Sequence, residues 1–467
     1  MTTEPTTRQV GDATLADFSA GLRGRVVRPS DPDFDQARSI WNGAHDRRPA
    51  AVVRCAGVSD VMNTIGLARS EGLALAVRAG GHSIPGFSTC DDGIVLDLSL
   101  MRGIRVDPQQ RRATIQTGCV WSDVDVETQQ FNLAVTGGLV SSTGVAGFTL
   151  GGGVGWLTRQ CGLTVDNLAG AEVITADGEW VTTRDDPNLL WGLQGGGGNF
   201  GVVTSLDLVL HDVGPTVFAG MVFYRADAAE DILGAYQDQC RSAPDGLTTL
   251  LKLTSAPVAP FVPEAARGTP VVVIGGCWAG DPAAAEGVTR PFRSLSPPIA
   301  DTYAARGYLE WQQALDAQFP RGLHCYFRSA FLAALDDRAI RTLAKSHGEL
   351  PNTLTEIIVH QLGGAAGRVD PAATAFAVRD QDYIVNVIAR TAGSAGFDDV
   401  KKWSRDLIST LAPAAPTYVN FTGEGSAEHV RTAYPPSTYQ RLVELKNRYD
   451  PDNLFRLNQN IPPVRTD

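Results

Sequence analysis

The stretch that decides the fold runs from Leu73 to Ser83 and reads LALAVRAGGHS. Its apolar first half predicts a strand, and this strand leads into a turn with two adjacent glycines. Glycine lets the backbone turn tightly and leaves N–H groups bare, which makes a cradle for an anion. Arg78 adds a cation, Ser83 adds a hydroxyl, and a ring nitrogen of His82 could meet the bound group. Residues 77–83, taken alone, also fit a glycine-rich turn with a histidine that faces solvent.

The segments around this stretch predict a strand–helix–strand unit. A helix is expected over residues 60–71, with Ser59 as its cap and Gly72 at its end. Residues 1–20 are expected to form a loose arm and one short helix. Apolar segments predict strands at 22–27, 51–55, 93–98, 113–117, 171–175 and 202–210, and a helix at 121–131.

A second glycine-rich tract covers residues 136–157 and reads TGGLVSSTGVAGFTLGGGVGWL. Flexible linkers are polar, whereas this tract alternates glycine with apolar residues. We therefore expect backbone wrapped closely around a flat or extended ligand, with a purely structural, turn-rich segment as the alternative.

The pattern changes near residue 212 and predicts a second, α+β domain. Alternating segments predict a sheet covered on one face by helices. The strands are expected at 217–224, 270–277, 326–332 and 355–362, and the helices near 227–241, 308–318, 336–348 and 397–411. A last segment follows, with a helix over 438–449. The expected domains are 1–212, which binds the cofactor, 213–412, which binds the substrate, and 413–467, which returns to the first domain.

Composition excludes several classes of function. The net charge is −11 and no basic block occurs, which argues against nucleic acid or an anionic membrane as a partner. The seven cysteines are scattered without zinc spacing, so we expect reduced thiols, no metal site and a cytoplasmic location. No apolar run is long enough to span a membrane, and Met1–Pro5 does not begin a Sec signal.

One glycine-rich motif resembles a dinucleotide-binding loop but lacks the structural context of one. Residues 196–201, GGGNFG, match the letters of a dinucleotide-binding loop. Such a loop must open a helix, whereas residues 202–204 continue as a strand. An extended cofactor that carries phosphate, with its reactive end covered by the second domain, fits the separated glycine loops better.

From about residue 40 to Pro463 the chain resembles the vanillyl-alcohol-oxidase/PCMH flavoprotein superfamily, in its berberine-bridge-enzyme-like branch. The motifs that carry the resemblance are residues 78–83, 144–147 with 151–155, 195–203 and 449–455. They are closest to those of the bacterial 6-hydroxy-D-nicotine-oxidase-like group. The resemblance implies a PCMH-type FAD-binding domain of two α/β subdomains and a substrate domain with an antiparallel sheet covered by helices.

The resemblance also implies a bound FAD, with His82 at the position of the histidine bonded to the flavin 8α carbon. Residues 78–83 would wrap the pyrophosphate, and residues 137–155 would line the flavin. The residues expected to contact FAD are Arg78, Ala79, Gly80, Gly81, His82, Ser83, Gly137, Gly138, Ser142, Thr143, Gly144, Gly147, Phe148, Gly151, Gly152, Gly155, Val203, Tyr418, Asn420 and Asn458.

Many members of the branch have a second flavin bond, from a cysteine in a Cys-Pro-Thr-x-Gly motif. Laid on Gly144, that cysteine falls at Val140. Cys161 lies beyond the triple glycine, so we expect a packed thiol there and a single covalent link through His82.

The implied reaction is hydride transfer from a C–H next to an amine or alcohol of a small substrate, with O₂ as the acceptor and H₂O₂ as the product. Polar candidates for catalysis are His360, Gln361 and Tyr326. The tyrosine base of some relatives is replaced by Phe421, and their glutamate is missing after Gly364; both absences weaken a simple alcohol-oxidase interpretation.

The electron acceptor and the substrate stay open at this point. Thr143 matches the position thought to gate oxygen in relatives, but it is neither the Val nor the Leu usual there. A dehydrogenase with another acceptor, an oxidase of sugars and a non-catalytic flavin scaffold are the alternatives. A monomer and a homodimer are both compatible with the sequence.

Overall fold

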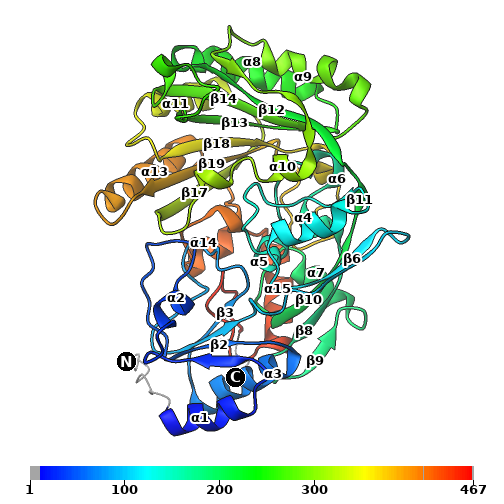
Figure 1. The fold of residues 1–467 in the computed structure, drawn as a ribbon, viewed down its shortest axis with the longest axis vertical. Coiled ribbons are helices and arrows are strands. Elements are labelled where there is room, and N and C mark those ends of the chain that lie inside the picture. Colours follow the sequence, from blue (N-terminus) through cyan, green and yellow to red (C-terminus); the bar gives the residue numbers. More distant parts are fainter. Residues whose placement is uncertain (1–10, 414, 465–467) are drawn as a thin grey trace.

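The structure, a computed structural model, describes residues 11–413 and 415–464. It has two tiers, with one large sheet and its helices above and a four-stranded and a five-stranded sheet below (Figure 1). The expected short N-terminal helix is α1 (Asp12–Ala20). The expected loose arm falls on residues 1–10, which lie outside the described residues.

The lower tier begins with a four-stranded sheet in the order β1-β2-β4-β3. Strands β2 (Ala51–Arg54) and β3 (Leu75–Arg78) run parallel to the central β4 (Ile94–Asp97), and β1 (Arg25–Val27) pairs antiparallel with β2. This order places β3, and the glycine turn that follows it, at one edge of the sheet. The stretch that decides the fold is thus an edge strand with its carboxyl end free to meet a ligand.

Helix α3 (Val58–Glu71) connects β2 to β3 and ends at Gly72, whose φ of 65° is left-handed. The predicted cap at Ser59 is wrong, because the helix begins two residues earlier than expected, at Val58, after Gly57. The carboxylate of Asp60 ties this first turn to the preceding chain, where it accepts hydrogen bonds from the N–H groups of Arg23, Gly24 and Ala56.

The second sheet of the lower tier is antiparallel, in the order β5-β6-β10-β8-β9. Helices α4 (Trp121–Gln129) and α7 (Pro187–Leu193) belong to the same unit. The long glycine tract lies between α4 and β8 and contains the short helix α5 (Val145–Leu150), with α6 (Thr158–Cys161) just after it. The strands are β5 (Ile104–Asp107), β6 (Arg112–Gln116), β8 (Leu168–Ile174), β9 (Trp180–Thr182) and β10 (Val202–Val209).

The upper tier is one antiparallel sheet of eight strands, in the order β15-β12-β14-β13-β18-β19-β17, with β16 also paired to β12. Four of these strands lie where they were predicted, whereas β13, β15, β16 and β19 were not predicted. The strands are β12 (Thr216–Arg225), β13 (Leu247–Ser255), β14 (Pro270–Trp278), β15 (Ala300–Asp301), β16 (Ala304–Gly307), β17 (His324–Leu332), β18 (Glu356–Gln361) and β19 (Tyr383–Thr391).

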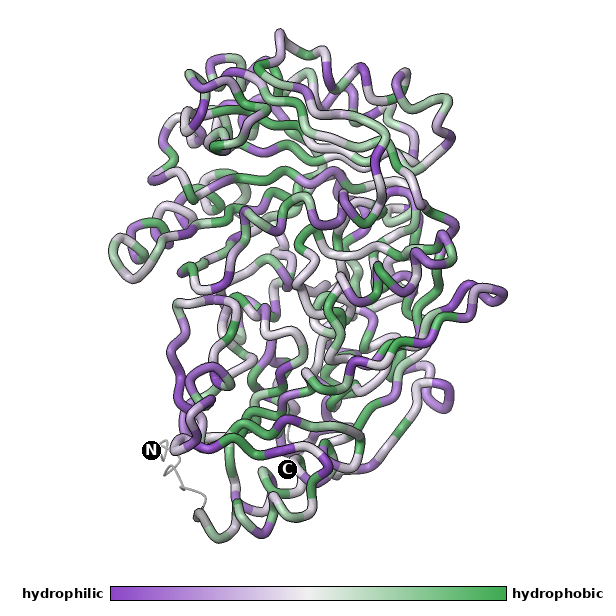
Figure 2. The backbone as a smooth tube through the Cα atoms, viewed as in Figure 1, coloured by the Kyte–Doolittle hydropathy of each residue, from purple (hydrophilic) through white to green (hydrophobic). Residues whose placement is uncertain are grey.

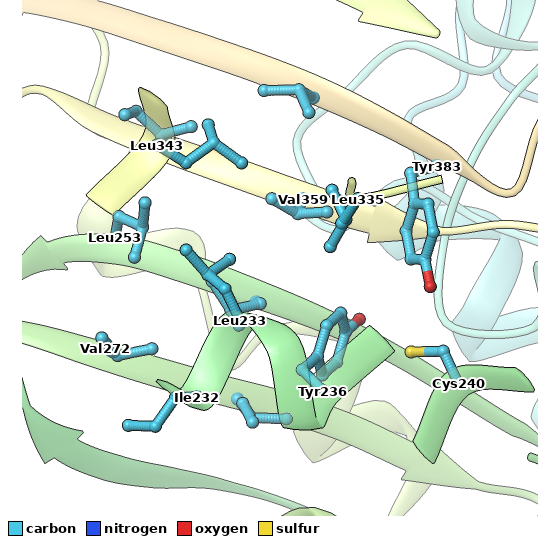
Figure 3. Close-up of a cluster of buried hydrophobic side chains, with 14 of the residues drawn as sticks. Ile232, Leu233, Tyr236, Cys240, Leu253, Val272, Leu335, Leu343, Val359 and Tyr383 are labelled. Carbon is cyan, nitrogen blue, oxygen red and sulfur yellow. The ribbon is translucent and has the colours of Figure 1, made fainter. Parts of the chain in front are cut away.

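Helices cover one face of this sheet, as predicted. Apolar side chains of α8 and α11 meet side chains of the central strands in a continuous core (Figure 3). The helices are α8 (Ala229–Ser242), α9 (Ala285–Arg293), α11 (Asp337–Gly348) and α13 (Phe397–Leu411). The helix predicted over 308–318 is shorter: α10 (Tyr308–Gln312) ends early, and a separate 3₁₀ turn covers Asp316–Gln318.

The other face of the sheet is turned toward the lower tier, and the site lies between the two. Leu250, Ile358 and Ile388 from this face share a core with Trp156 of the glycine tract. The hydrophobic segments follow the inner strands of both tiers, and the hydrophilic ones follow the outer helices and turns (Figure 2). No helix among the described residues combines the length and the apolar character needed to cross a bilayer.

The last segment returns from the upper tier to the lower one. It contains α14 (Ala427–Thr432) and α15 (Pro436–Tyr449), which packs against α7. At the end of α15, Lys446 and Asp450 form an ion pair of 2.6 Å with no exposed surface. The Lys446 ammonium also donates to the carbonyl oxygens of Asn199 and Phe455, so it joins the last segment to the glycine loop before β10.

Candidate active site

A cavity of about 380 Å³ lies where the two tiers meet. Its lower wall is made by three glycine-rich segments, and its upper wall by strands β17, β18 and β19. The last segment supplies Val419–Thr422 and residues 457–459. Parts of the chain that are hundreds of residues apart therefore enclose one space.

The turn after β3 leaves its backbone N–H groups bare. The N–H groups of Gly80, Gly81, His82 and Ser83 donate to no other described residue. Gly81 has a φ of 68°, and a Cβ on Gly80 would meet the Cα atom of Gly144 at 2.3 Å. Backbone this close to a second backbone, with unpaired donors, is a cradle for an anionic group.

Arg78 lies behind this cradle. Its guanidinium is buried and donates to the carboxylate of Asp97 at 2.8 Å, and Arg78 does not line the cavity. The pair joins the ends of β3 and β4, where Arg78 and Asp97 are register partners. Arg78 thus fixes the start of the turn, and the other five predicted residues of the turn line the cavity.

His82 presents its ring to the cavity wall. The ring stacks on Trp41 with centroids 4.6 Å apart, and Nε2 lies 3.1 Å from the hydroxyl of Ser142. The enclosing protein lowers the pKa of His82 to about 3, and the nearby Arg321 acts in the same direction. The imidazole is therefore neutral at physiological pH, which is the form with a free lone pair for bond formation.

The long glycine tract divides into residues that line the cavity and residues that support them. Gly138, Thr143, Gly144, Gly147, Phe148 and Gly151 line it. Gly137, Gly152 and Gly155 lie behind, where a Cβ on Gly155 would meet the Gly137 carbonyl oxygen at 1.8 Å. Ser142 also lies behind and reaches the site only through His82.

Residues of the last segment form hydrogen bonds that hold this tract in place. The hydroxyl of Tyr418 accepts a hydrogen bond from the N–H of Gly153 at 2.6 Å. Asn420 donates to the Phe148 carbonyl at 3.0 Å and to the Tyr418 hydroxyl at 3.1 Å. Asn420 lines the cavity, whereas Tyr418 does not.

The third glycine segment contributes more than was predicted. Val203 lines the cavity as expected, and Gly195–Asn199 line it too, although only Val203 was named there. Across from them lie Asn458 and Gln459, whose side-chain oxygens are buried and without a partner among the described residues. The GGGNFG sequence at residues 196–201 is not a dinucleotide-binding loop, but its glycines did indicate backbone that lies close to a ligand.

The three candidates for catalysis lie in different places. His360 lines the cavity, and its ring stacks on Phe421 with centroids 5.1 Å apart. Gln361 points to the opposite face of the sheet, where it accepts from Thr249 at 2.6 Å and donates to the Cys240 carbonyl.

Tyr326 is also outside the cavity lining, because its neighbour Phe327 takes the inward position on β17. Its hydroxyl donates to Glu424 and accepts from Arg405. Only His360 of the three can touch a bound substrate.

Asn386 on β19 is a polar cavity residue that the sequence analysis missed. It is 1% exposed, and its Oδ1 atom has no partner among the described residues. The asparagine interrupts an apolar run, YIVNVIART, which was the available signal.

The cavity fits FAD on the residues that are present. The bare N–H groups of the 80–83 turn suit a pyrophosphate, and the flat, side-chain-free walls at Gly138, Gly144 and Gly151 suit a ring system. The unpaired side-chain oxygens of Asn458 and Gln459 offer acceptors for N–H or O–H groups of the cofactor. No cluster of metal-ligating side chains occurs among the residues that the structure describes.

Comparisons with known proteins agree with this site. The FAD binding domain family matches residues 49–184, and the berberine and berberine-like family matches residues 417–462. The chain is 31% identical to (R)-6-hydroxynicotine oxidase of Paenarthrobacter nicotinovorans over 460 residues, which cover 95% of this chain and 97% of that one.

Two solved structures extend the comparison. The crystal structure of 6-hydroxy-D-nicotine oxidase from Arthrobacter nicotinovorans superposes with a TM-score of 0.85 at 29% identity, over 95% of this chain and 98% of that one. Glucooligosaccharide oxidase from Acremonium strictum, described with a 6-S-cysteinyl, 8α-N1-histidyl FAD, has a TM-score of 0.85 at 20% identity, over 97% of this chain and all of that one, and shows the fold alone.

Fold, cavity and matched domains define an FAD-dependent oxidoreductase with a PCMH-type flavin domain. The chain belongs to the berberine-bridge-enzyme-like family of FAD-linked oxidoreductases.

Proposed function

We propose that this protein is an oxidase that takes a hydride from a C–H next to an amine or alcohol of a small organic substrate, with O₂ as the final acceptor and H₂O₂ as the product. The observation that carries the proposal is the neutral His360 on the sheet wall, opposite the glycine walls that suit a flavin. The 31% identical relative is named an oxidase, which supports this choice.

In the reaction the substrate loses a hydride from carbon and a proton from the neighbouring oxygen or nitrogen. Bound FAD would supply the two-electron acceptor, and the two electrons and both hydrogens finally reach O₂ as H₂O₂. The chain positions the substrate and excludes water. His360 offers a hydrogen-bond acceptor to the group that loses its proton, and the stacked ring of Phe421 limits the orientation of this imidazole. Burial lowers the pKa of His360 to about 3, so it holds the substrate as a neutral ring and carries no proton of its own to the reaction.

We further propose that His82 forms the single covalent bond to the flavin. Its ring is at the cavity wall and neutral. All seven cysteines are buried, and none of them lines the cavity. Val140 occupies the lining where relatives have the second link, and burial raises the pKa of the Cys161 thiol to about 12, which makes it unreactive.

Acid precipitation tests the covalent bond. We expect flavin absorbance in the pellet and an intact mass increased by one FAD for the wild-type chain and for Cys161→Ser. His82→Ala should release all flavin into the supernatant. Flavin in the supernatant of the wild-type protein, or a partial loss in Cys161→Ser, would contradict the single histidyl link.

The second candidate function is a dehydrogenase with another electron acceptor. Thr143 lines the cavity, and a polar side chain at this position is the feature that favours it. Turnover in air should yield one H₂O₂ per substrate if the oxidase proposal holds. Turnover that needs an added dye, and stays unchanged when oxygen is removed, would select the dehydrogenase.

We propose the division into residues 1–212, 213–412 and 413–467 as functional domains. It is supported by the break between β11 (His211–Asp212), which pairs with β7 (Leu133–Ala134), and β12, which begins at Thr216. The end of α13 at Leu411 supports the second boundary. A small-molecule substrate, a monomeric or homodimeric state and a cytoplasmic location complete the proposal.

A further inference from the structure

The sheet wall of the cavity carries two polar side chains in an apolar surface. These are His360 on β18 and Asn386 on β19. The rest of this wall consists of Phe327, Ile358 and Ile388, joined by Leu315 and Phe319 from the segment before β17. Nowhere in the described chain does an Asp, Glu, Lys or Arg line the cavity. A charged substrate would therefore lose its hydration without meeting an opposite charge, which is costly.

Both polar side chains lack a partner. Nε2 of His360 and Oδ1 of Asn386 are buried and bond to no described residue, and the two residues are 4% and 1% exposed. His360 is the register partner of Ile384, two positions from Asn386, which places the two on one face about 7–8 Å apart by strand geometry. Buried polar atoms are almost always paired, so an unpaired couple facing one cavity indicates a ligand group that pairs with both.

A buried ionic cluster just beyond Ile358 selects against cations. Lys252 and Arg390 both contact Glu356, at 2.8 Å and 3.3 Å, and all three are almost fully buried. Burial would raise the pKa of Glu356, but Lys252 and Arg390 outweigh it and hold this pKa below its ordinary value. The cluster therefore carries one more positive than negative charge beside the cavity.

The cluster is closed to the ligand, because its remaining donors are used within the protein. Lys252 donates to the Gln318 side chain at 2.9 Å, and Arg390 donates to the Gln318 carbonyl at 2.6 Å. The Arg390 guanidinium also lies 4.6 Å from the centroid of Phe319, whose ring lines the cavity. It can repel an ammonium group through space but cannot bind a carboxylate directly.

We propose that the substrate is an uncharged, largely apolar molecule with one hydroxyl or neutral amino group, and that His360 and Asn386 hold this group together. Such a group donates a hydrogen bond to one of the two unpaired acceptors, Nε2 of His360 or Oδ1 of Asn386, and a neutral amino group can donate to both. This inference rests on the proposed function. It excludes sugars, because a polyhydroxylated ring would leave most of its hydroxyls without partners against this wall.

The test is ligand binding to the flavin-loaded protein, measured by calorimetry and by perturbation of flavin absorbance under anaerobic conditions. The probes share one skeleton: 2-naphthylmethanol, 2-naphthylmethylamine, 2-naphthoate, (2-naphthylmethyl)trimethylammonium and 2-methylnaphthalene, with cellobiose as the sugar. We expect the alcohol to bind at least about tenfold more tightly than either charged probe and than cellobiose. The amine should bind more tightly as pH rises toward its own pKa, whereas the affinity of the alcohol should not change.

Variants separate the two polar side chains from general packing. His360→Leu and Asn386→Leu should each weaken binding of the alcohol by about fivefold to tenfold and leave 2-methylnaphthalene unchanged. His360→Gln should restore part of the lost affinity, because it keeps an acceptor. His324→Leu on β17 is the matched control, since His324 is outside the cavity lining, and it should bind like the wild type.

The outcomes distinguish this inference from the function it rests on. Selective binding of the alcohol without flavin reduction would retain the inference and count against the proposed oxidation of that group. Equal or tighter binding of naphthoate, the quaternary ammonium or cellobiose would overturn the inference while leaving the oxidoreductase intact. Failure of the alcohol to bind up to its solubility, or unchanged binding in both leucine variants, would overturn it as well.

Discussion

At the scale of single residues, His360 couples the site to the stability of the fold. Burial lowers its pKa to about 3, whereas the same side chain in the unfolded chain titrates near 6.5. The unfolded state therefore binds more protons in the window between these values, and the stability contributed by the neutral ring is lost as pH falls through it.

We expect His360→Gln to flatten the pH dependence of unfolding. When the pH falls from 7 to 5, the neutral His360 ring should lower the unfolding free energy of the wild type by about 2 kcal/mol. The variant lacks this titrating group, so its unfolding free energy should fall by about 2 kcal/mol less over the same range. Urea unfolding at a series of pH values measures this difference. Identical slopes for wild type and variant would mean that His360 is not buried as a neutral ring.

Gly80 shows how closely the backbone segments approach at the cradle. A Cβ there would meet the Cα and N atoms of Gly144 at 2.3 Å and 2.5 Å. Gly80→Ala should therefore force the two loops apart, cost about 1–3 kcal/mol of folding free energy and abolish retention of flavin. Gly66→Ala on α3, where nothing lies within 4 Å, is the control and should keep flavin with equal or higher stability. Retention of flavin in Gly80→Ala, scored by absorbance after gel filtration, is the result that would count against the cradle.

The chemistry of single residues was predictable from the sequence where it depends on glycine or on the alternation of residues along a strand. The bare turn at 80–83 follows from two glycines after a strand, and the structure has it. The choice of both His360 and Gln361 as catalytic candidates overlooked the strand period, which places adjacent residues on opposite faces, and the structure turns Gln361 away from the cavity. The partner Asn386 could not be found in this way, because its strand was not predicted.

At the scale of elements, the missed strands share a physical cause. Residues 247–255 and 383–391 form inner strands of the eight-stranded sheet and are buried on both faces at most positions. Such strands have no alternation of polar and apolar residues to detect. Burial is not the whole reason, because β14 and β18 are buried at nearly all positions too and were predicted.

Helix α15 depends on its buried ion pair. Lys446→Met would leave the Asp450 carboxylate and two backbone carbonyls without their partner, and we expect a loss of about 3–5 kcal/mol in unfolding free energy. Lys402→Met removes a pair of the same spacing, to Asp406, on the exposed face of α13, and should cost less than about 1 kcal/mol. Similar losses in the two variants, by chemical denaturation, would mean that burial does not set the value of the pair.

At the scale of the whole molecule, Arg159 joins the two tiers. Arg159 lies in α6 of the lower tier, is 6% exposed, and donates to the carbonyls of Ala243, Leu247 and Leu362 in the upper tier. These bonds cross the boundary at a place where the backbone has no regular pairing. We therefore expect Arg159 to make the two tiers unfold as one unit.

Arg159→Met should uncouple them. Two signals are followed on heating: flavin fluorescence, which rises when the cofactor site opens, and far-ultraviolet circular dichroism, which falls when secondary structure is lost. The two transitions should coincide in the wild type and separate in the variant. Arg368→Met is the control, because Arg368 pairs with Asp245 at the surface and should leave the transitions together. Coincident transitions in Arg159→Met would show that apolar packing alone couples the tiers.

The cradle for the cofactor is closed by segments from both ends of the chain, and this fixes the order of events during biosynthesis. The turn at 80–83 leaves the ribosome first, whereas Asn458 and Gln459 complete the cavity wall only when almost all of the chain has been made. We expect nascent chains stalled before residue 413 to carry no flavin even when FAD is abundant. Attachment should begin only after the chain is released. Flavin on the stalled chains would show that the N-terminal loops bind it without the last segment. Loading of the cofactor would then report that synthesis has been completed, since an interrupted chain would stay colourless.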